Sequence, residues 1–189
     1  MDNYFDSKDF EKVDFSESKI NKGEYDNCSF TSCNFSDVHA SNIQFVECTF
    51  IDCNFSNAIV KNTAFKEVHF ENCKMIGVNF HEVDPFLLKM DFTKCQLSFS
   101  SFRGMKLNNT YFKNCTLEEV DFSDASLTSA VFDSSILNRT VFSQTNLEKV
   151  DFRTAETFSI NPEENRLKGA KFSKENITGL LDKYKISIE

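Results

Sequence analysis

Large apolar residues recur at every fifth position through most of the chain, and the residues between them are mostly polar. Neither a helix, with about 3.6 residues per turn, nor a strand, which alternates every second residue, has this period. A strict short period is typical of a solenoid, in which each coil stacks on the one before. The period is unbroken between Asn114 and Phe152, at Leu117, Phe122, Leu127, Phe132, Leu137, Phe142, Leu147 and Phe152.

The period continues towards the N-terminus in two registers. The first runs back from Phe152 through Phe92 to Leu87, and the second covers residues from Phe5 to Phe80. Phe80 and Leu87 are seven residues apart, so two extra residues lie near 81–86, beside Pro85. We expect a small bulge at one corner of the solenoid there rather than a domain boundary.

A second inward position precedes each large apolar residue by two. It holds small or medium residues, mostly Val, Ala and Cys, and the other three positions of each pentapeptide are mostly polar. This is the binary pattern of a thin β-solenoid. All seven cysteines occupy the small position, at Cys28, Cys33, Cys48, Cys53, Cys73, Cys95 and Cys115.

The cysteine spacing favours packing over chemistry. The gaps are multiples of five, or 22 across the bulge, whereas zinc sites use gaps of about two to four residues. A free thiol is a good small buried hydrophobe. Stacked side chains that point the same way are poorly placed for disulfides. We therefore expect buried free cysteines and no metal.

Size and charge restrict the possible functions. The 189 residues fit one domain, and a net charge of −8 disfavours direct nucleic-acid binding. The sequence has no run of about 18 apolar residues for a membrane span, and residues 1–10 lack a signal-peptide core. We expect a cytoplasmic location. With only five Gly and two Pro, the many turns must use Asn, Asp and Ser.

The repeats resemble those of the pentapeptide-repeat family, whose motif is Ala-(Asp/Asn)-(Leu/Phe)-x-x. The resemblance covers roughly residues 3–157 and implies an all-β fold, a right-handed quadrilateral β-helix of four pentapeptides per coil. Residues twenty apart would then be neighbours, and equivalent side chains would stack in ladders. The matching central pairs are Asp14-Phe15, Asn34-Phe35, Asn54-Phe55, Asn79-Phe80, Asp91-Phe92, Asp121-Phe122 and Asp151-Phe152.

The regular period ends after Phe152, which divides the chain into a β-helix over 1–157 and a C-terminal segment over 158–189. From Ser173, a plausible N-cap, the sequence predicts a short helix, and Ile186 and Ile188 then alternate with polar residues as in a brief strand. The segment would cap the β-helix or form a dimer. The apolar stripe of the predicted helix is Ile177, Leu180, Leu181 and Tyr184.

No pattern of catalytic residues is present. The three His fall on outward positions, and the sequence has no nucleophile–base pair or phosphate-binding Gly loop. We expect no enzymatic activity and no cofactor.

Two outward surfaces are candidates for binding. One side of the solenoid is acidic, which gives either a partner surface or simply a solvated face. The other is an apolar belt of Val131, Ile136 and Val141 on three successive sides, either covered by the C-terminal segment or used in a dimer with the stripe at Ile177 and Leu181. The acidic side carries Asp9, Glu11, Asp52, Glu71, Asp91, Asp133 and Asp151.

Within the family, residues 151–156 and 159–166 are similar to the exit segment of the topoisomerase-protecting group, which includes the microcin B17 immunity protein and the Qnr quinolone-resistance proteins. That resemblance implies a homodimer joined at its C-terminal ends. It also implies binding to DNA gyrase or topoisomerase IV and protection of that enzyme from a toxin or antibiotic. Gram-negative Qnr proteins carry projecting loops, whereas here only two extra residues interrupt the coils. The alternative is a general protein-interaction scaffold.

Overall fold

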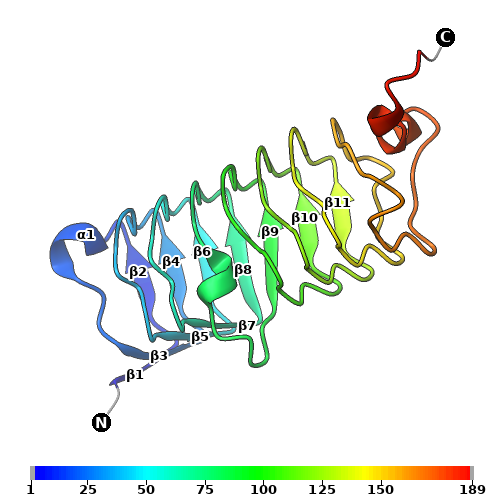
Figure 1. Ribbon diagram of the computed structural model, residues 1–189. Helices are drawn as coiled ribbons and strands as arrows, with labels where there is room; N and C mark the ends of the chain where they lie inside the picture. The colour runs from blue at the N-terminus through cyan, green and yellow to red at the C-terminus, as the bar shows by residue number, and fades with distance from the viewer. Residues whose placement is uncertain (1–2, 188–189) are drawn as a thin grey trace.

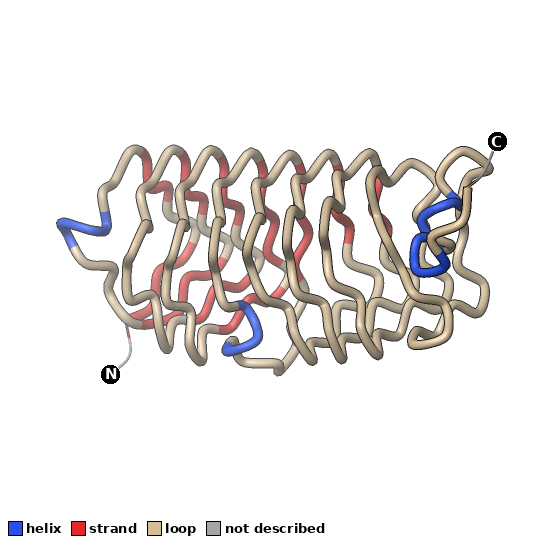
Figure 2. The backbone as a smooth tube through the Cα atoms, turned by 45° about the horizontal axis from the view of Figure 1, so that its top comes forward, coloured by secondary structure: helices blue, strands red, loops and turns tan. Residues whose placement is uncertain are grey.

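The computed structural model describes residues 3–187 and forms a four-sided, right-handed β-helix, as expected (Figures 1 and 2). Four pentapeptides make one coil, and every strand pairing is parallel. One side is a seven-stranded sheet, which we call the long sheet: β2 (Asp9–Glu11), β4 (Ser29–Thr31), β6 (Thr49–Ile51), β8 (Val68–Glu71), β9 (Met90–Thr93), β10 (Tyr111–Lys113) and β11 (Val131–Asp133). A neighbouring side is a four-stranded sheet: β1 (Asn3–Asp6), β3 (Gly23–Asp26), β5 (Gln44–Val46) and β7 (Ala64–Lys66).

The other two sides are held by isolated parallel bridges rather than by strands. Examples are Asn34 with Asn54 and Ser101 with Asp121. The bridges continue past residue 157, since Asp151 pairs with Lys171, so the coil geometry extends into the C-terminal segment.

The core is a set of ladders of identical side chains. Along the side of the long sheet and its continuation past β11, nine phenyl rings stack face to face, and Phe112 and Phe132 have centroids 4.9 Å apart with an interplanar angle of 4°. Rings on adjoining sides meet edge to face, as Phe122 and Phe132 do at 82°. Both arrangements are favourable for aromatic pairs. The nine rings are Phe10, Phe30, Phe50, Phe70, Phe92, Phe112, Phe132, Phe152 and Phe172.

The seven cysteines are buried, which confirms their predicted role in packing. Each thiol also donates a hydrogen bond to a carbonyl of the preceding coil: Cys53 Sγ lies 3.3 Å from Phe30 O, and Cys73 Sγ lies 3.4 Å from Phe50 O. The small inward position therefore also joins successive coils.

Most corners contain a residue in the left-handed region, two positions after the large apolar residue. Asn, Asp and Ser supply many of these, as predicted, but Glu and Lys supply others. Even Phe99 adopts this conformation, with φ of 62°. Non-glycine residues pay an energetic penalty there, so the stacked coils must enforce the geometry.

The bulge lies where the sequence predicted it. Phe70 pairs with Phe92, 22 residues on, whereas Phe50 pairs with Phe70, 20 residues on. The placement of Leu87 in the inward ladder is wrong: its side chain is exposed, and Leu88 packs against the core in its place. The coil enters the bulge through a 3₁₀ turn, η1 (Phe80–Glu82).

The predicted short C-terminal helix is present, in 3₁₀ rather than α form. The segment forms two 3₁₀ turns, η2 (Ile177–Leu180) and η3 (Asp182–Tyr184). The prediction of Ser173 as the N-cap is wrong: Asn176 holds the N-cap position of η2, and Ser173 Oγ accepts a hydrogen bond from Asn176 N at 3.2 Å in the turn before it. Ile186 lies outside any strand, and Ile188 lies outside the described residues.

A short helix at the other end was not foreseen. The segment α1 (Phe15–Ser18) begins at Asp14, whose Oδ1 accepts a hydrogen bond from Ser16 N at 2.9 Å. Among residues 3–187, no helix has the length and apolar character that crossing a membrane would need.

Candidate partner-binding surfaces

The long sheet carries five of the seven carboxylates of the predicted acidic side. Successive rungs place Asp9 and Asp91 in one column and Glu11 and Glu71 in the next. Asp151 extends the first column beyond β11 through its bridge to Val131, and Asp52 lies at the corner after β6.

The carboxylates on this face are separated by neutral or basic side chains. Between Asp9 and Asp91 in their column lie Ser29, Thr49 and His69. With rungs about 4.8 Å apart, these two carboxylates are roughly 19 Å apart. Double-stranded DNA carries one charge per about 1.7 Å of its axis. The charge density of the face is therefore far below that of a DNA duplex.

Two of the seven carboxylates are also partly neutralised. Asp151 forms a bidentate ion pair with Arg153, with Arg153 Nη2 2.7 Å from Asp151 Oδ2, and this holds the pKa of Asp151 below its usual range. Glu71 lies 3.7 Å from Lys94 Nζ. In each pair at least one of the two side chains is exposed to solvent, so neither ion pair adds much stability.

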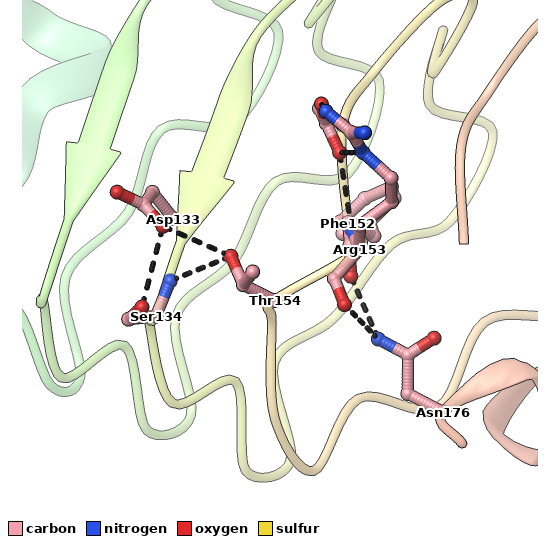
Figure 3. A network of polar contacts seen from close by, with 7 residues as sticks. Asp133, Ser134, Phe152, Arg153, Thr154 and Asn176 are labelled. Atoms are coloured by element: carbon pink, nitrogen blue, oxygen red, sulfur yellow. Dashed lines mark hydrogen bonds and ion pairs between the residues drawn. The ribbon is translucent and has the colours of Figure 1, made fainter. Parts of the chain in front are cut away.

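Four of the remaining five carboxylates, those of Asp9, Asp52, Asp91 and Asp133, accept hydrogen bonds from the next rung. Asp91 Oδ1 accepts a hydrogen bond from Tyr111 N at 2.8 Å, in the next rung. Asp133 Oδ1 accepts from Thr154 Oγ1 at 3.0 Å, and Thr154 Oγ1 in turn accepts from Ser134 N at 3.0 Å (Figure 3). These bonds fix the carboxylates in position, which lowers the entropy that a partner must remove on binding.

A depression of about 500 Å³ lies in the C-terminal half of the same face. It is lined by Tyr111, Val131, Asp133, Asp151 and Arg153. It combines an exposed aromatic ring with charged groups of both signs, a composition suited to a protein partner. The sequence pattern assigned Val131 to the apolar belt and did not predict that this residue lies beside the acidic residues.

Of the other predicted dimer residues, some side chains are exposed and others are partly buried. Ile136 and Val141 are 41% and 46% exposed, so the expectation that the C-terminal segment covers them is wrong. Ile177 and Tyr184 are also exposed, whereas Leu180 packs against the core and Leu181 is partly buried. The stripe therefore combines anchoring residues with exposed ones.

The way in which the C-terminal segment closes the rod was also missed. Asn176 Nδ2 donates hydrogen bonds to Phe152 O at 2.7 Å (Figure 3) and to Ala155 O at 3.0 Å, two carbonyls at the C-terminal end of the β-helix. Gly179 lies against the ring of Phe158, where an added Cβ would come within 2.3 Å of the Phe158 carbonyl oxygen. The spacing of Ser173 and Asn176 was the sequence signal for this cap.

No cluster suited to metal binding emerges in residues 3–187. Within them no three His, Cys, Asp or Glu side chains are grouped so that they could hold a metal ion. What the geometry offers is a set of rigid surfaces.

Comparison with solved structures identifies the same fold. A trypsin-treated variant of QnrB1, a plasmid-mediated fluoroquinolone resistance protein, is 15% identical, with a TM-score of 0.74 over 99% of this chain and 92% of that chain. Full-length QnrB1 is 17% identical, with a TM-score of 0.55 over 97% and 100% of the two chains. Identities this low establish the fold alone.

A search of curated proteins finds no match to this sequence. The family model for the pentapeptide repeat region matches residues 23–85 and 86–157, which is most of the chain. The chain therefore belongs to the pentapeptide repeat family.

Proposed function

We propose that this protein is a non-enzymatic, duplex-shaped ligand of a type II topoisomerase, either DNA gyrase or topoisomerase IV, and that it protects that enzyme from a toxin or antibiotic. The observation that carries the proposal is the long sheet: a face that follows the rod and bears five carboxylates, with Asp52 and Asp151 beside it. The shared fold with QnrB1, a fluoroquinolone resistance protein, supports it.

In this proposal the long sheet lies in the channel that the enzyme uses for DNA. Basic side chains lining such a channel would meet Asp9, Asp91 and Asp133, which the sheet holds in fixed positions. Complementary charge of this kind raises the association rate and sets the orientation more than it adds affinity. Shape then supplies most of the contact.

A supercoiling assay tests the proposal. Purified gyrase is incubated with relaxed plasmid, with and without a fluoroquinolone or a peptide toxin of gyrase, and the protein is titrated in. Restored supercoiling in the presence of the poison, or direct inhibition in its absence, is the expected result. If neither gyrase nor topoisomerase IV responds, the proposal is wrong.

We further propose that two copies associate through their C-terminal ends, with Ile177 and Tyr184 packed between them. Both side chains are exposed, at 46% and 49%, next to anchored residues of the same turns. Sedimentation equilibrium should give a dimer for the native chain and a monomer for Ile177→Asp. A monomeric native chain would rule the dimer out.

The second candidate is a scaffold for an unrelated protein partner. The ion pairs that neutralise Glu71 and Asp151 favour it, because they weaken the resemblance of the face to DNA. Chemical cross-linking in cells followed by mass spectrometry distinguishes the two. Recovery of one reproducible partner other than a topoisomerase would favour the scaffold.

A further inference from the structure

The bulge projects two apolar side chains into solvent. Phe86 and Leu87 are 65% and 66% exposed, the highest values among the large hydrophobic residues that the structure describes. They lie in the coil of 22 residues, next to the four-stranded sheet: Asp84 bridges to Ala64 of β7, and Lys66 Nζ of β7 lies 5.8 Å from the centroid of the Phe86 ring. Adjacent exposed apolar residues of this kind mark an interaction site.

The exposed pair is held in a fixed shape. Val83 is buried before it, and Leu88 packs against the core after it. Between these anchors, Asp84 Oδ1 accepts a hydrogen bond from Phe86 N at 2.9 Å. The backbone is therefore pre-organised, and binding would require little ordering of this segment.

A pocket of about 610 Å³ lies beside the pair, between the bulge and the next coil. Its apolar walls come from Val83, Pro85, Leu88 and Met105. At Gly104, also in its lining, an added Cβ would meet no atom within 4 Å, so this corner is open. The volume lies within the usual range for ligand pockets and would hold one or two large side chains.

The rim of the pocket is basic although the chain is acidic overall. His81, Arg103 and Lys106 line it, whereas the net charge of the protein is −8. Arg103 is paired with Asp124 at 3.1 Å. Lys106 forms no ion pair within residues 3–187 and is exposed. A ligand carboxylate placed beside Lys106 would meet an available positive charge.

We propose that this pocket binds a short acidic segment of a protein partner, with an apolar side chain seated between Phe86 and Met105 and a carboxylate beside Lys106. Three rim groups with apolar walls suit such a peptide better than a nucleic acid, which is held by rows of cations. The inference does not depend on the partner being a topoisomerase.

Selection from a phage library of random peptides, roughly twelve residues long, tests this proposal without assuming a partner. Enriched peptides should combine Asp or Glu with Leu, Ile or Phe. The amide resonance of Gly104 should shift when such a peptide is added to ¹⁵N-labelled protein. If no peptide is enriched, or if enriched peptides are basic or leave Gly104 unchanged, the proposal fails.

Matched variants locate the site. Phe86→Ser and Lys106→Glu should each weaken binding of a selected peptide by about tenfold, measured by fluorescence anisotropy. The controls are Phe99→Ser, which changes an exposed Phe outside the pocket lining, and Lys113→Glu, which changes an exposed Lys of the long sheet. Equal losses in variants and controls would overturn the assignment, as would binding of a DNA duplex or self-association that depends on Phe86.

Discussion

At the scale of the residue, the fold depends on one large side chain that closes each pentapeptide. Phe122 has no exposed surface and stacks with Phe102 and Phe142, at centroid distances of 5.1 and 5.5 Å. The core is only a few side chains wide, so few neighbours can move to fill a vacated space. A cavity in a close-packed interior is costly for that reason.

Replacing Phe122 by Ala should lower the free energy of unfolding by roughly 3–5 kcal/mol, since it removes a fully buried ring and leaves a cavity. Chemical denaturation monitored by circular dichroism measures the change. Phe99→Ala is the control, because Phe99 is 55% exposed. Equal unfolding midpoints for Phe122→Ala and the native chain would contradict the stacked core.

The thiols offer a second test at the same scale. Burial raises the pKa of Cys48 to about 12, so its nucleophilic thiolate is scarce at neutral pH. We expect the native protein to react very slowly with Ellman's reagent, and all seven thiols to react at once in guanidinium chloride. Fast reaction of most thiols in the native state would contradict the packing role.

At the scale of the element, the β-helix needs a cap on its terminal coil as well as the repeated coils. A terminal coil exposes carbonyl groups that the next coil would otherwise pair, and repeat proteins generally need such a cap. Here a side-chain amide replaces part of the missing rung: Asn176 Nδ2 bonds to Phe152 O and Ala155 O. The ring of Phe158 packs beside Phe172 beneath the cap.

Asn176→Ala should therefore destabilise the C-terminal end by about 1–3 kcal/mol, because it leaves part-buried carbonyls without their donor. Hydrogen exchange should show faster exchange in the last coils, whereas the coils near Phe50 stay protected. Lys174→Ala, at an exposed neighbouring position, is the control. If exchange at the end is unchanged, the amide is not the cap.

The sequence predicts the structure of the repeated coils better than that of the chain ends and the bulge. The inward ladders followed from the sequence because each coil repeats the same environment, so that Phe112 and Phe132 have equivalent neighbours. The 3₁₀ turns at Ile177–Leu180 did not follow, since an amphipathic stripe does not distinguish them from an α-helix. Leu87 and Leu88 compete for one inward position, and the choice depends on how Pro85 directs the chain.

The arrangement of the acidic residues followed from the sequence better than their interactions did. Period alone grouped the seven carboxylates, five of which lie in the long sheet. The ion pair of Asp151 with Arg153 depends on side-chain orientations that spacing does not determine. The cap and the bulge pocket were missed because they form where the repeat fails, so the period carries no information about them.

At the scale of the whole molecule, we expect the charges of the long sheet to affect partner binding only when several of them are removed together. Replacing Asp9, Asp91 and Asp133 together by Asn keeps the side-chain size and removes three negative charges. We expect protection in the supercoiling assay to weaken by about tenfold, or ~1.4 kcal/mol, mainly through slower association. The effect should diminish as salt is raised.

A matched triple variant controls for net charge. Asp121→Asn, Asp124→Asn and Glu148→Gln together remove the same charge from positions outside the long sheet. This control should protect nearly as well as the native chain. Equal losses in the two triple variants would mean that total charge, rather than this face, determines binding.

The 22-residue coil shows where such a rod tolerates added chain length. Phe70 and Phe92 stack at 5.3 Å across it, close to the 5.2 Å between Phe92 and Phe112 in the following regular coil. The extra residues are accommodated outside the ladder, and both flanking rungs pair as though nothing had been inserted. The corner between Asp84 and Lys89 is thus a natural graft point, where a foreign epitope could be displayed while the scaffold around it keeps its alignment.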